Sequence, residues 1–202
     1  RSLGFSSIHY ESLSYVLART YADLDTTSLC VHVGSLSTTI ALMRGACTLS
    51  MTTLPIGEYT VYHIIHGWVD HDDDLARKVY RRYGILPSHR DTRLYAALEG
   101  HVTPLIDTVR EYEVQSHMYQ YVPRAHTSSI PTRIVITGQG ASMPGLKQFL
   151  NREVRSDIEE PPLSRFLYND SDMRVPDIDL TDIPRYAPVL SAGIDYMRTR
   201  RA

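Results

Sequence analysis

The stretch "LCVHVGSLSTTIAL", Leu29 to Leu42, determines the fold class that we predict for this chain. It holds two apolar runs, separated by a glycine and a cluster of small hydroxyl residues. Runs rich in Val, Ile and Leu around a polar break are typical of two strands joined by a tight turn. Such a turn can also hold a phosphate, because it offers backbone N–H groups and hydroxyls. The polar His32 interrupts the first apolar run just before the turn.

Three consecutive strands are predicted around this stretch, in the segments "TSLCVHVG", "STTIALMRG" and "ACTLSMTTLP". Gly34 and Arg44-Gly45 separate them, and such short links favour antiparallel pairing. A further short apolar strand, "RIVIT" over 133–137, follows a long excursion and is expected to join the same sheet. The prediction is an α/β fold with a mixed sheet flanked by helices.

Helices are predicted where apolar residues recur at helical spacing. The segments concerned are 9–23, 58–69, much of 70–125, the residues after the glycines near 140, and 184–198. Pro104 is expected to start a helix or to kink one. Residues 156–183 are acidic and rich in proline, so we expect them to be irregular. The resulting division is an entry helix over 1–27, a sheet subdomain over 28–69 and 131–202, and a helical insertion over 70–130.

Composition excludes several classes of protein. The chain has 202 residues, 43% of them hydrophobic, and a formal net charge of −2, so nucleic acid is not an expected partner. No apolar run reaches the roughly 20 residues of a membrane helix. Cys30 and Cys47 fall in predicted strands and are expected to be reduced, buried core residues. Because the chain begins at Arg1 without a signal-like segment, we expect it to be part of a longer protein.

A second turn of glycines and hydroxyls follows the predicted strand at 133–137. The residues are "TGQGAS", Thr137 to Ser142, and they precede a predicted helix. Glycines at such a place let a flat ligand approach the backbone, and a helix N-terminus favours anions. A tight connection between strand and helix explains them equally well. The two turns, about 100 residues apart in the sequence, are more specific together than either is alone.

Other polar clusters favour structural interpretations. The residues His63, His66 and His71, with Asp70 and Asp72 to Asp74, could bind a metal, but a solvated helix end is the preferred interpretation. The group of Tyr95, Tyr112, Tyr119 and Tyr121 is interpreted as a packing stripe or a partner surface. Ser142 has no His and Asp partners at a recognisable spacing, so a hydrolase triad is not predicted.

The order of these motifs resembles the actin-like ATPase superfamily, in particular its PilM-type pilus assembly proteins and their cell-division relative FtsA. "VHVGSLSTTIALMRGACTLSMTTLPIG" is similar to the family's second phosphate motif, and "RIVITGQGASMPGLKQFL" is similar to its adenosine motif. "LGFSSIHYESLSYVLART" and "YAPVLSAGIDYMR" resemble the helices that enter and close the second half. The resemblance implies an actin-like, ribonuclease H-like fold that binds ATP with Mg.

The resemblance also implies the residues of a nucleotide site. They are Gly34, Ser35, Ser37 and Thr38 for the phosphates, and Gly138, Gln139, Gly140, Ala141 and Ser142 for the base. His32 stands where the family has an aspartate that orients metal-bound water, and Glu58 stands where a second glycine is frequent. The half that carries the first phosphate motif has no counterpart in this sequence. We therefore expect ATP binding by this chain to be weak or absent, and no residue is predicted to be catalytic.

Three functions follow as hypotheses. The first is a non-hydrolysing scaffold of a type IV pilus or secretion platform, cytoplasmic and peripheral to the inner membrane, which binds the cytoplasmic tail of a bitopic membrane protein. The second is the C-terminal half of an active, FtsA-type ATPase. The third is a nucleotide-free interaction module of a type II secretion assembly protein. Homo-oligomer formation stays open. Aromatic residues often anchor interfaces, and those expected to be exposed for a partner are Tyr59, Tyr62, Trp68, Tyr80 and Tyr83.

Overall fold

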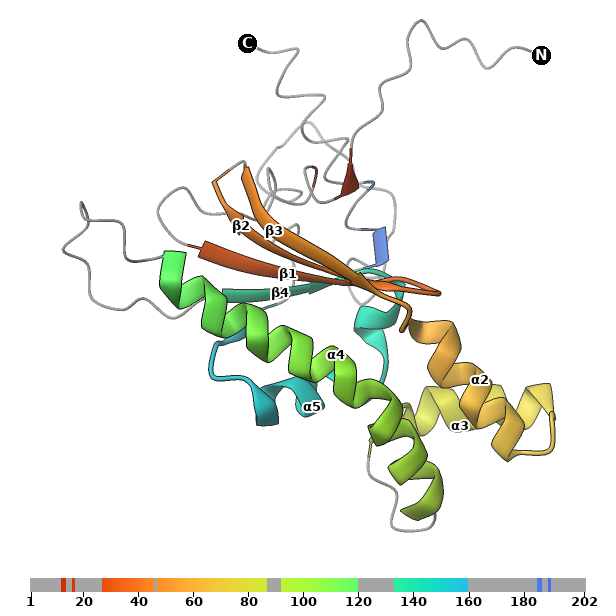
Figure 1. Cartoon of the computed structure of the whole chain (residues 1–202). Helices are drawn as coiled ribbons and strands as arrows, with labels where there is room; N and C mark the ends of the chain where they lie inside the picture. Colours follow the sequence, from red (N-terminus) through yellow and green to blue (C-terminus); the bar gives the residue numbers. More distant parts are fainter. Residues whose placement is uncertain are drawn as a thin grey trace, which may run out of the picture.

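The described part of the chain is organised around one mixed sheet (Figure 1). The structure is a computed structural model. It describes residues 12, 13, 16, 27–45, 47–86, 92–119, 133–159, 185, 186 and 189. Among these, five strands form a single sheet in the order β3-β2-β1-β4-β5. The α/β fold with a mixed sheet is therefore confirmed.

The strands lie where the apolar segments predicted them, with one addition. β1 (Thr27–Val33), β2 (Thr38–Arg44) and β3 (Cys47–Leu54) pair antiparallel in sequence order. β4 (Arg133–Thr137) pairs parallel with β1, as expected for the strand that returns after the long excursion. The short β5 (Ile158–Glu159) continues the sheet beyond β4 and was not predicted, because it has only two residues in a polar segment.

The helices of the described residues extend below the sheet in Figure 1. They are α2 (Glu58–Trp68), α3 (Asp73–Tyr83), α4 (Thr92–Tyr119), the short 3-10 helix η1 (Gln139–Ser142) and α5 (Leu146–Glu153). The expected helices over 9–23 and 184–198 lie largely outside the described residues, as does most of the segment 156–183. No helix in the described ranges is sufficiently long and apolar to cross a membrane.

The long helix α4 shows that a helix start at Pro104, one of the two expected roles, is wrong. The proline lies inside α4, twelve residues after its start, and does not begin a helix. An interior proline costs about 3 kcal/mol relative to alanine. Four buried side chains of α4 offset this cost by packing into the core that the helix shares with the sheet: Val102, Leu105, Ile106 and Val109. Helix α4, which belongs to the expected insertion, is thus part of the sheet's own core.

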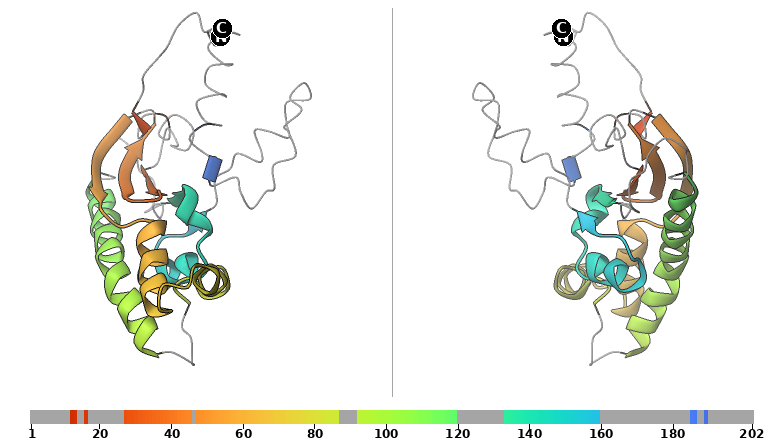
Figure 2. Two further views of the ribbon diagram at one scale, coloured as in Figure 1. Left: turned by 90° about the vertical axis from the view of Figure 1, so that its right-hand side faces the viewer. Right: turned by 90° about the vertical axis from the view of Figure 1, so that its left-hand side faces the viewer.

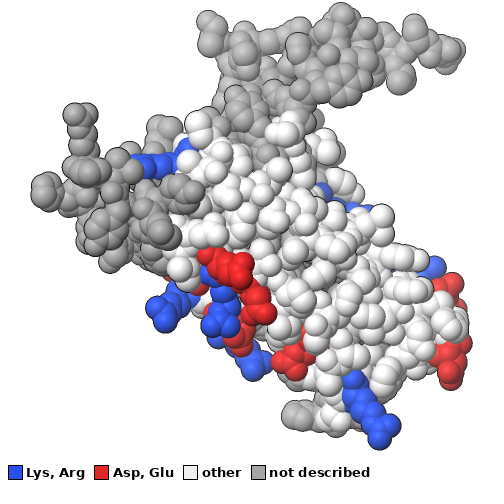
Figure 3. All heavy atoms as spheres, in the orientation of Figure 1, with Lys and Arg blue, Asp and Glu red and all other residues white. Residues whose placement is uncertain are grey.

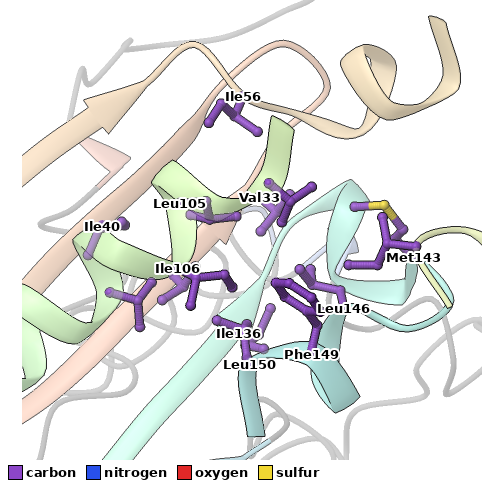
Figure 4. Close-up of a cluster of buried hydrophobic side chains, with 14 of the residues drawn as sticks. Val33, Ile40, Ile56, Leu105, Ile106, Ile136, Met143, Leu146, Phe149 and Leu150 are labelled. Atoms are coloured by element: carbon purple, nitrogen blue, oxygen red, sulfur yellow. The ribbon is translucent and has the colours of Figure 1, made fainter. Parts of the chain in front are cut away.

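One hydrophobic cluster joins the sheet to its helices (Figure 4). Val33 and Ile40 of the sheet face Leu105 and Ile106 of α4 in this cluster, and α5 adds Leu146, Phe149 and Leu150. Of the predicted tyrosine stripe, Tyr112 is buried in the cluster and Tyr95 is half-buried. The side chain of Tyr119 and the whole of Tyr121 lie outside the described residues.

A buried carboxylate of α4 binds the segment that follows α5. Glu113 is 5% exposed, and its Oε1 accepts hydrogen bonds from the backbone N–H groups of Arg155 and Ser156 at 2.9 and 2.6 Å. The hydroxyl of Ser156 donates to the same oxygen at 2.6 Å. These bonds satisfy a buried polar group and fix the segment that leads into β5.

The edge strand β3 corrects the expectation for Cys47. Cys30 of β1 is buried, as predicted, but Cys47 is exposed, and both thiols are free. Residues of β3 alternate between exposed and half-buried positions, and none of them is buried because the strand lies at the edge of the sheet. The apolar residue at 47 therefore points away from the core. Figure 3 shows that the surface over β2 and β3 carries almost no charge on the face in view.

Candidate functional site

The two turns predicted as a nucleotide site meet at one end of the sheet. β1 and β4 run parallel, with His32 opposite Thr137 in register. The Gly34 turn and the Gly138 turn therefore leave the same edge, side by side, although about 100 residues separate them in sequence. Figures 1 and 2 show α2, which follows β3, and η1, which is part of the second turn, next to each other at this end.

The first turn is closed by its own hydrogen bonds. The backbone N–H of Gly34 donates to the carbonyl of Ser37 at 2.9 Å. The hydroxyl of Thr38 is fully buried and donates to the carbonyl of Ile56 at 2.6 Å. Ser35 is exposed and Ser37 is half-buried. Of the phosphate-binding residues that the sequence predicts here, Gly34 and Thr38 are thus already engaged within the protein.

The start of α2 is docked on the first turn. The N–H groups of Glu58 and Tyr59 donate to the carbonyls of Gly34 and Ser35 at 3.0 and 2.8 Å. The N–H of Gly57 donates to the hydroxyl of Thr60 at 3.2 Å. Helix N-termini bind anions through N–H groups that lack a partner, and these three N–H groups have one.

The glycines of the second turn serve close packing. Gly138 has a φ of 95°, a conformation that side chains rarely adopt, and a Cβ on it would overlap the Val33 carbonyl. A Cβ on Gly140 would overlap the Val33 side chain and contact Glu58. Ala141 is half-buried, and the exposed Ser142 donates its hydroxyl to the carbonyl of Gln139 at 3.3 Å. These contacts favour the structural explanation of the glycines, a tight connection from strand to helix.

A pocket of about 270 Å³ opens where α2 and α3 meet the two turns. Its lining comprises Ser35, Glu58, Tyr59, Tyr62, Arg77, Tyr80, Arg81 and Gln139. Of the nine residues predicted to hold a nucleotide, only Ser35 and Gln139 are among those lining it. The turns converge, but the pocket beside them is lined mainly by residues other than those predicted to hold a nucleotide.

The tyrosines predicted as an exposed partner surface are partly packed. Tyr59 is 51% exposed and Trp68 is 42% exposed. Tyr62 and Tyr80 pack against the hydrophobic core and form an edge-to-face pair with ring centroids 6.2 Å apart. Tyr83 is half-buried and lies beneath the Arg82 guanidinium. The expected exposure of Tyr62, Tyr80 and Tyr83 is therefore wrong, because the rings of Tyr62 and Tyr80 pack between α2 and α3 and Tyr83 is half-buried.

The phenol of Tyr80 is held neutral in the pocket wall. Its hydroxyl donates to Oε1 of Glu58 at 2.8 Å. Burial, and then the negative charge of Glu58, raise the pKa of Tyr80 well above its usual 10.0. This bond links α3 to the first residue of α2 and engages one oxygen of the only carboxylate that lines the pocket.

His32 lies at the base of the two turns and is held by β4. Its Nδ1 is 3.0 Å from the hydroxyl oxygen of Thr137. Burial lowers the pKa of His32 below its usual 6.5, so the neutral imidazole is favoured at pH 7. The Cys30 thiol is 3.8 Å from the same oxygen, and burial raises its pKa to about 12. Neither side chain supplies negative charge near the turns.

The histidines between α2 and α3 form contacts of their own. His66 Nε2 lies 3.3 Å from Asp73 Oδ1, and the Nδ1 atoms of His66 and His71 are 3.2 Å apart. Tyr62 also donates to Asp73 Oδ1, at 3.1 Å. Within the described ranges, no group of three or more His, Cys, Asp or Glu residues is arranged to hold a metal ion.

The sequence interpretation missed the two arginines of the pocket. Arg77 and Arg81 lie four residues apart on α3, so they share one face of the helix. Their spacing is visible in the sequence. What the sequence does not show is that this face of α3 turns toward the Gly34 and Gly138 turns.

Comparison with known proteins supports the fold. No protein-family model matches the chain, and no curated protein matches it significantly. Among solved structures, a PilM-PilN type IV pilus biogenesis complex matches with a TM-score of 0.59 at 22% identity, covering 90% of this chain and 50% of the other. MreB5 of Spiroplasma citri bound to ADP matches with a TM-score of 0.62 at 10% identity, covering 95% and 60%.

An archaeal actin homologue matches with a TM-score of 0.56 at 10% identity, covering 92% of this chain and 52% of the other. The chain thus spans about half the length of these actin-like structures. The matches cover 90–95% of this chain. This chain has the fold of the actin-like superfamily.

Proposed function

We propose that this chain is part of an actin-like scaffold that does not hydrolyse nucleotide and that holds a protein partner. In this proposal it serves a type IV pilus or related secretion platform at the cytoplasmic face of the inner membrane, where it binds the cytoplasmic tail of a bitopic protein. One observation carries the proposal. The two turns converge as in a nucleotide site, yet the Gly34 N–H and the Thr38 hydroxyl are bonded within the protein, and the adjoining pocket is lined mainly by tyrosines and arginines.

The likeness to the PilM-PilN complex supports a role in binding protein. The aromatic residues at the pocket support it further, because tyrosine, tryptophan and arginine supply most anchor residues of protein interfaces. Tyr59 and Trp68 expose large parts of their rings on α2. The partner would contact this surface without any change in the sheet.

Absence of hydrolysis is supported by His32. Phosphoryl transfer depends on groups that position the attacking water and compensate charge in the transition state. A buried neutral imidazole bonded to Thr137 supplies no negative charge to a hydrated magnesium ion. If a nucleotide binds at all, its base would lie against Gly138 to Ser142 and its phosphates near Gly34 to Thr38.

Calorimetry and a phosphate-release assay on the chain with Mg-ATP test this proposal. We expect weak or no binding and no turnover, because the N–H groups at Gly34, Glu58 and Tyr59 already have partners. Binding of Mg-ATP at submicromolar concentration would contradict it. So would a measurable ATPase rate that the substitution His32→Ala abolishes.

A second candidate is an interaction module that never binds nucleotide, as in a type II secretion assembly protein. The packing of Gly138 and Gly140 against Val33 favours it, since this contact explains both glycines without a ligand. The same titration can exclude the second candidate. Weak, saturable binding of Mg-ATP would exclude the nucleotide-free module, whereas absence of binding agrees with both candidates.

A further inference from the structure

We propose that the pocket between α2 and α3 binds an acidic peptide segment of the protein partner through Arg77 and Arg81. The inference rests on the proposed function as a protein-binding scaffold and names the chemistry of the partner. It depends on the charge, the size and the walls of the pocket.

The pocket has an excess of positive charge. Arg77 and Arg81 are exposed and line it, and Lys78 and Arg82 are exposed beside them on α3. In the part of the chain that the structure describes, the ion pairs within 4.0 Å involve neither Arg77 nor Arg81. Glu58 is the only acidic residue in the lining, and one of its oxygens is engaged by Tyr80. Two guanidinium groups are thus available to an anion.

A carboxylate matches these donors. Arginine presents its N–H groups as a planar fork that pairs with both oxygens of a carboxylate. Two such residues one helical turn apart can bind two acidic side chains of one segment or hold one of them from both sides. Anion binding here depends on side chains, because the backbone N–H groups of Glu58 and Tyr59 already donate to the first turn.

The size of the pocket is sufficient for a few side chains. It measures about 270 Å³, near the lower end of the range of about 300–1,000 Å³ usual for pockets that bind small molecules. Its walls include the rings of Tyr59, Tyr62 and Tyr80, which offer apolar surface for the rest of a peptide. An acidic segment with neighbouring apolar residues fits this combination.

Selection of random twelve-residue peptides displayed on phage, against the immobilised chain, tests the proposal. We expect the selected peptides to be enriched in Asp and Glu. Fluorescein-labelled copies of the strongest binders should lose affinity by roughly tenfold or more with the double variant Arg77→Glu/Arg81→Glu. The variant Arg77→Lys/Arg81→Lys keeps the charge but loses the fork, so we expect an intermediate loss.

A matched control reverses the charge of Arg93 and Arg152, which are exposed on α4 and α5 and do not line the pocket. Circular dichroism of each variant serves as the control for folding. Equal losses in the control and in the pocket variant would overturn the proposal, because the effect would then reflect net charge. Displacement of the acidic peptide by Mg-ATP at lower concentration than by unlabelled peptide would also overturn it and assign the site to nucleotide.

The outcomes separate this inference from the proposed function. Selected peptides without excess Asp or Glu would overturn the inference and leave the scaffold in place. Failure to select any peptide would overturn the inference as well. Failure together with tight binding and turnover of Mg-ATP would overturn the proposed function too.

Discussion

The two glycine turns at the end of the sheet look alike in sequence but differ in their physical role. The Gly34 turn is a polar loop in which the Gly34 N–H and the Thr38 hydroxyl donate to nearby carbonyls. The Gly138 turn is shaped by contact, since its two glycines lie against Val33 of β1. A glycine next to hydroxyl residues after a strand therefore does not by itself indicate a ligand. Contact with the neighbouring strand determines whether such a glycine is needed for close packing.

The largest expected effect is a loss of stability that differs between the two turns. Gly138→Ala places a Cβ onto the Val33 carbonyl at a φ of 95°, so we expect a loss of about 3 kcal/mol or more in the free energy of unfolding. Gly34→Ala meets only the Ser37 carbonyl, at 2.9 Å, and should cost about 1 kcal/mol. Urea denaturation followed by circular dichroism measures both.

Gly140 provides the control for this comparison. Its added Cβ would overlap a side chain of Val33, which can be shortened. We expect Val33→Ala to recover part of the stability lost in Gly140→Ala, whereas it should recover nothing in Gly138→Ala, where the clash is with backbone. Equal losses at Gly34 and Gly138 would show that the second turn is not determined by close packing.

An intermediate effect is expected within the first turn. Thr38→Val keeps the shape of the side chain but leaves the Ile56 carbonyl without its hydroxyl donor at 2.6 Å. The loss should be about 1–2 kcal/mol in the free energy of unfolding. Ser35→Ala, at an exposed position of the same turn, should stay within about 0.5 kcal/mol. Equal stability of the two variants would show that the Thr38 hydroxyl is not a structural group.

Local patterns in the sequence were sufficient for much of this fold. β1, β2 and β4 could be predicted because their apolar residues are continuous, and Gly45, with a φ of 55°, indicated the hairpin between β2 and β3. The helix start expected at Pro104 was wrong because the packing of α4 on the sheet outweighs a local preference. Cys47 misled because an apolar residue on an edge strand can face solvent.

The site could be predicted only in part. The convergence of the two turns followed from adding 133–137 to the sheet beside the first strands. The pocket could not be predicted, because it depends on which face of α3 is directed at the Gly34 and Gly138 turns. Helical spacing alone does not determine that direction. The bonds from Glu113 to Arg155 and Ser156 join residues more than 40 positions apart, and no local pattern indicates them.

The smallest expected effect concerns His32, at the base of both turns. Burial lowers the pKa of His32 in the folded chain below the 6.5 of an exposed histidine, so the unfolded chain takes up a proton first as the pH falls. The stability that the neutral imidazole contributes is therefore complete above about pH 6.5 and is lost progressively below it.

His32→Asn keeps a polar group near Thr137 but does not titrate. Between about pH 7.5 and pH 5.5, the urea midpoint of the wild type should fall more than that of the variant. The other histidines are the same in both proteins, so the difference between the two midpoints reports on His32. Parallel pH profiles would show that the imidazole is not desolvated by the two turns.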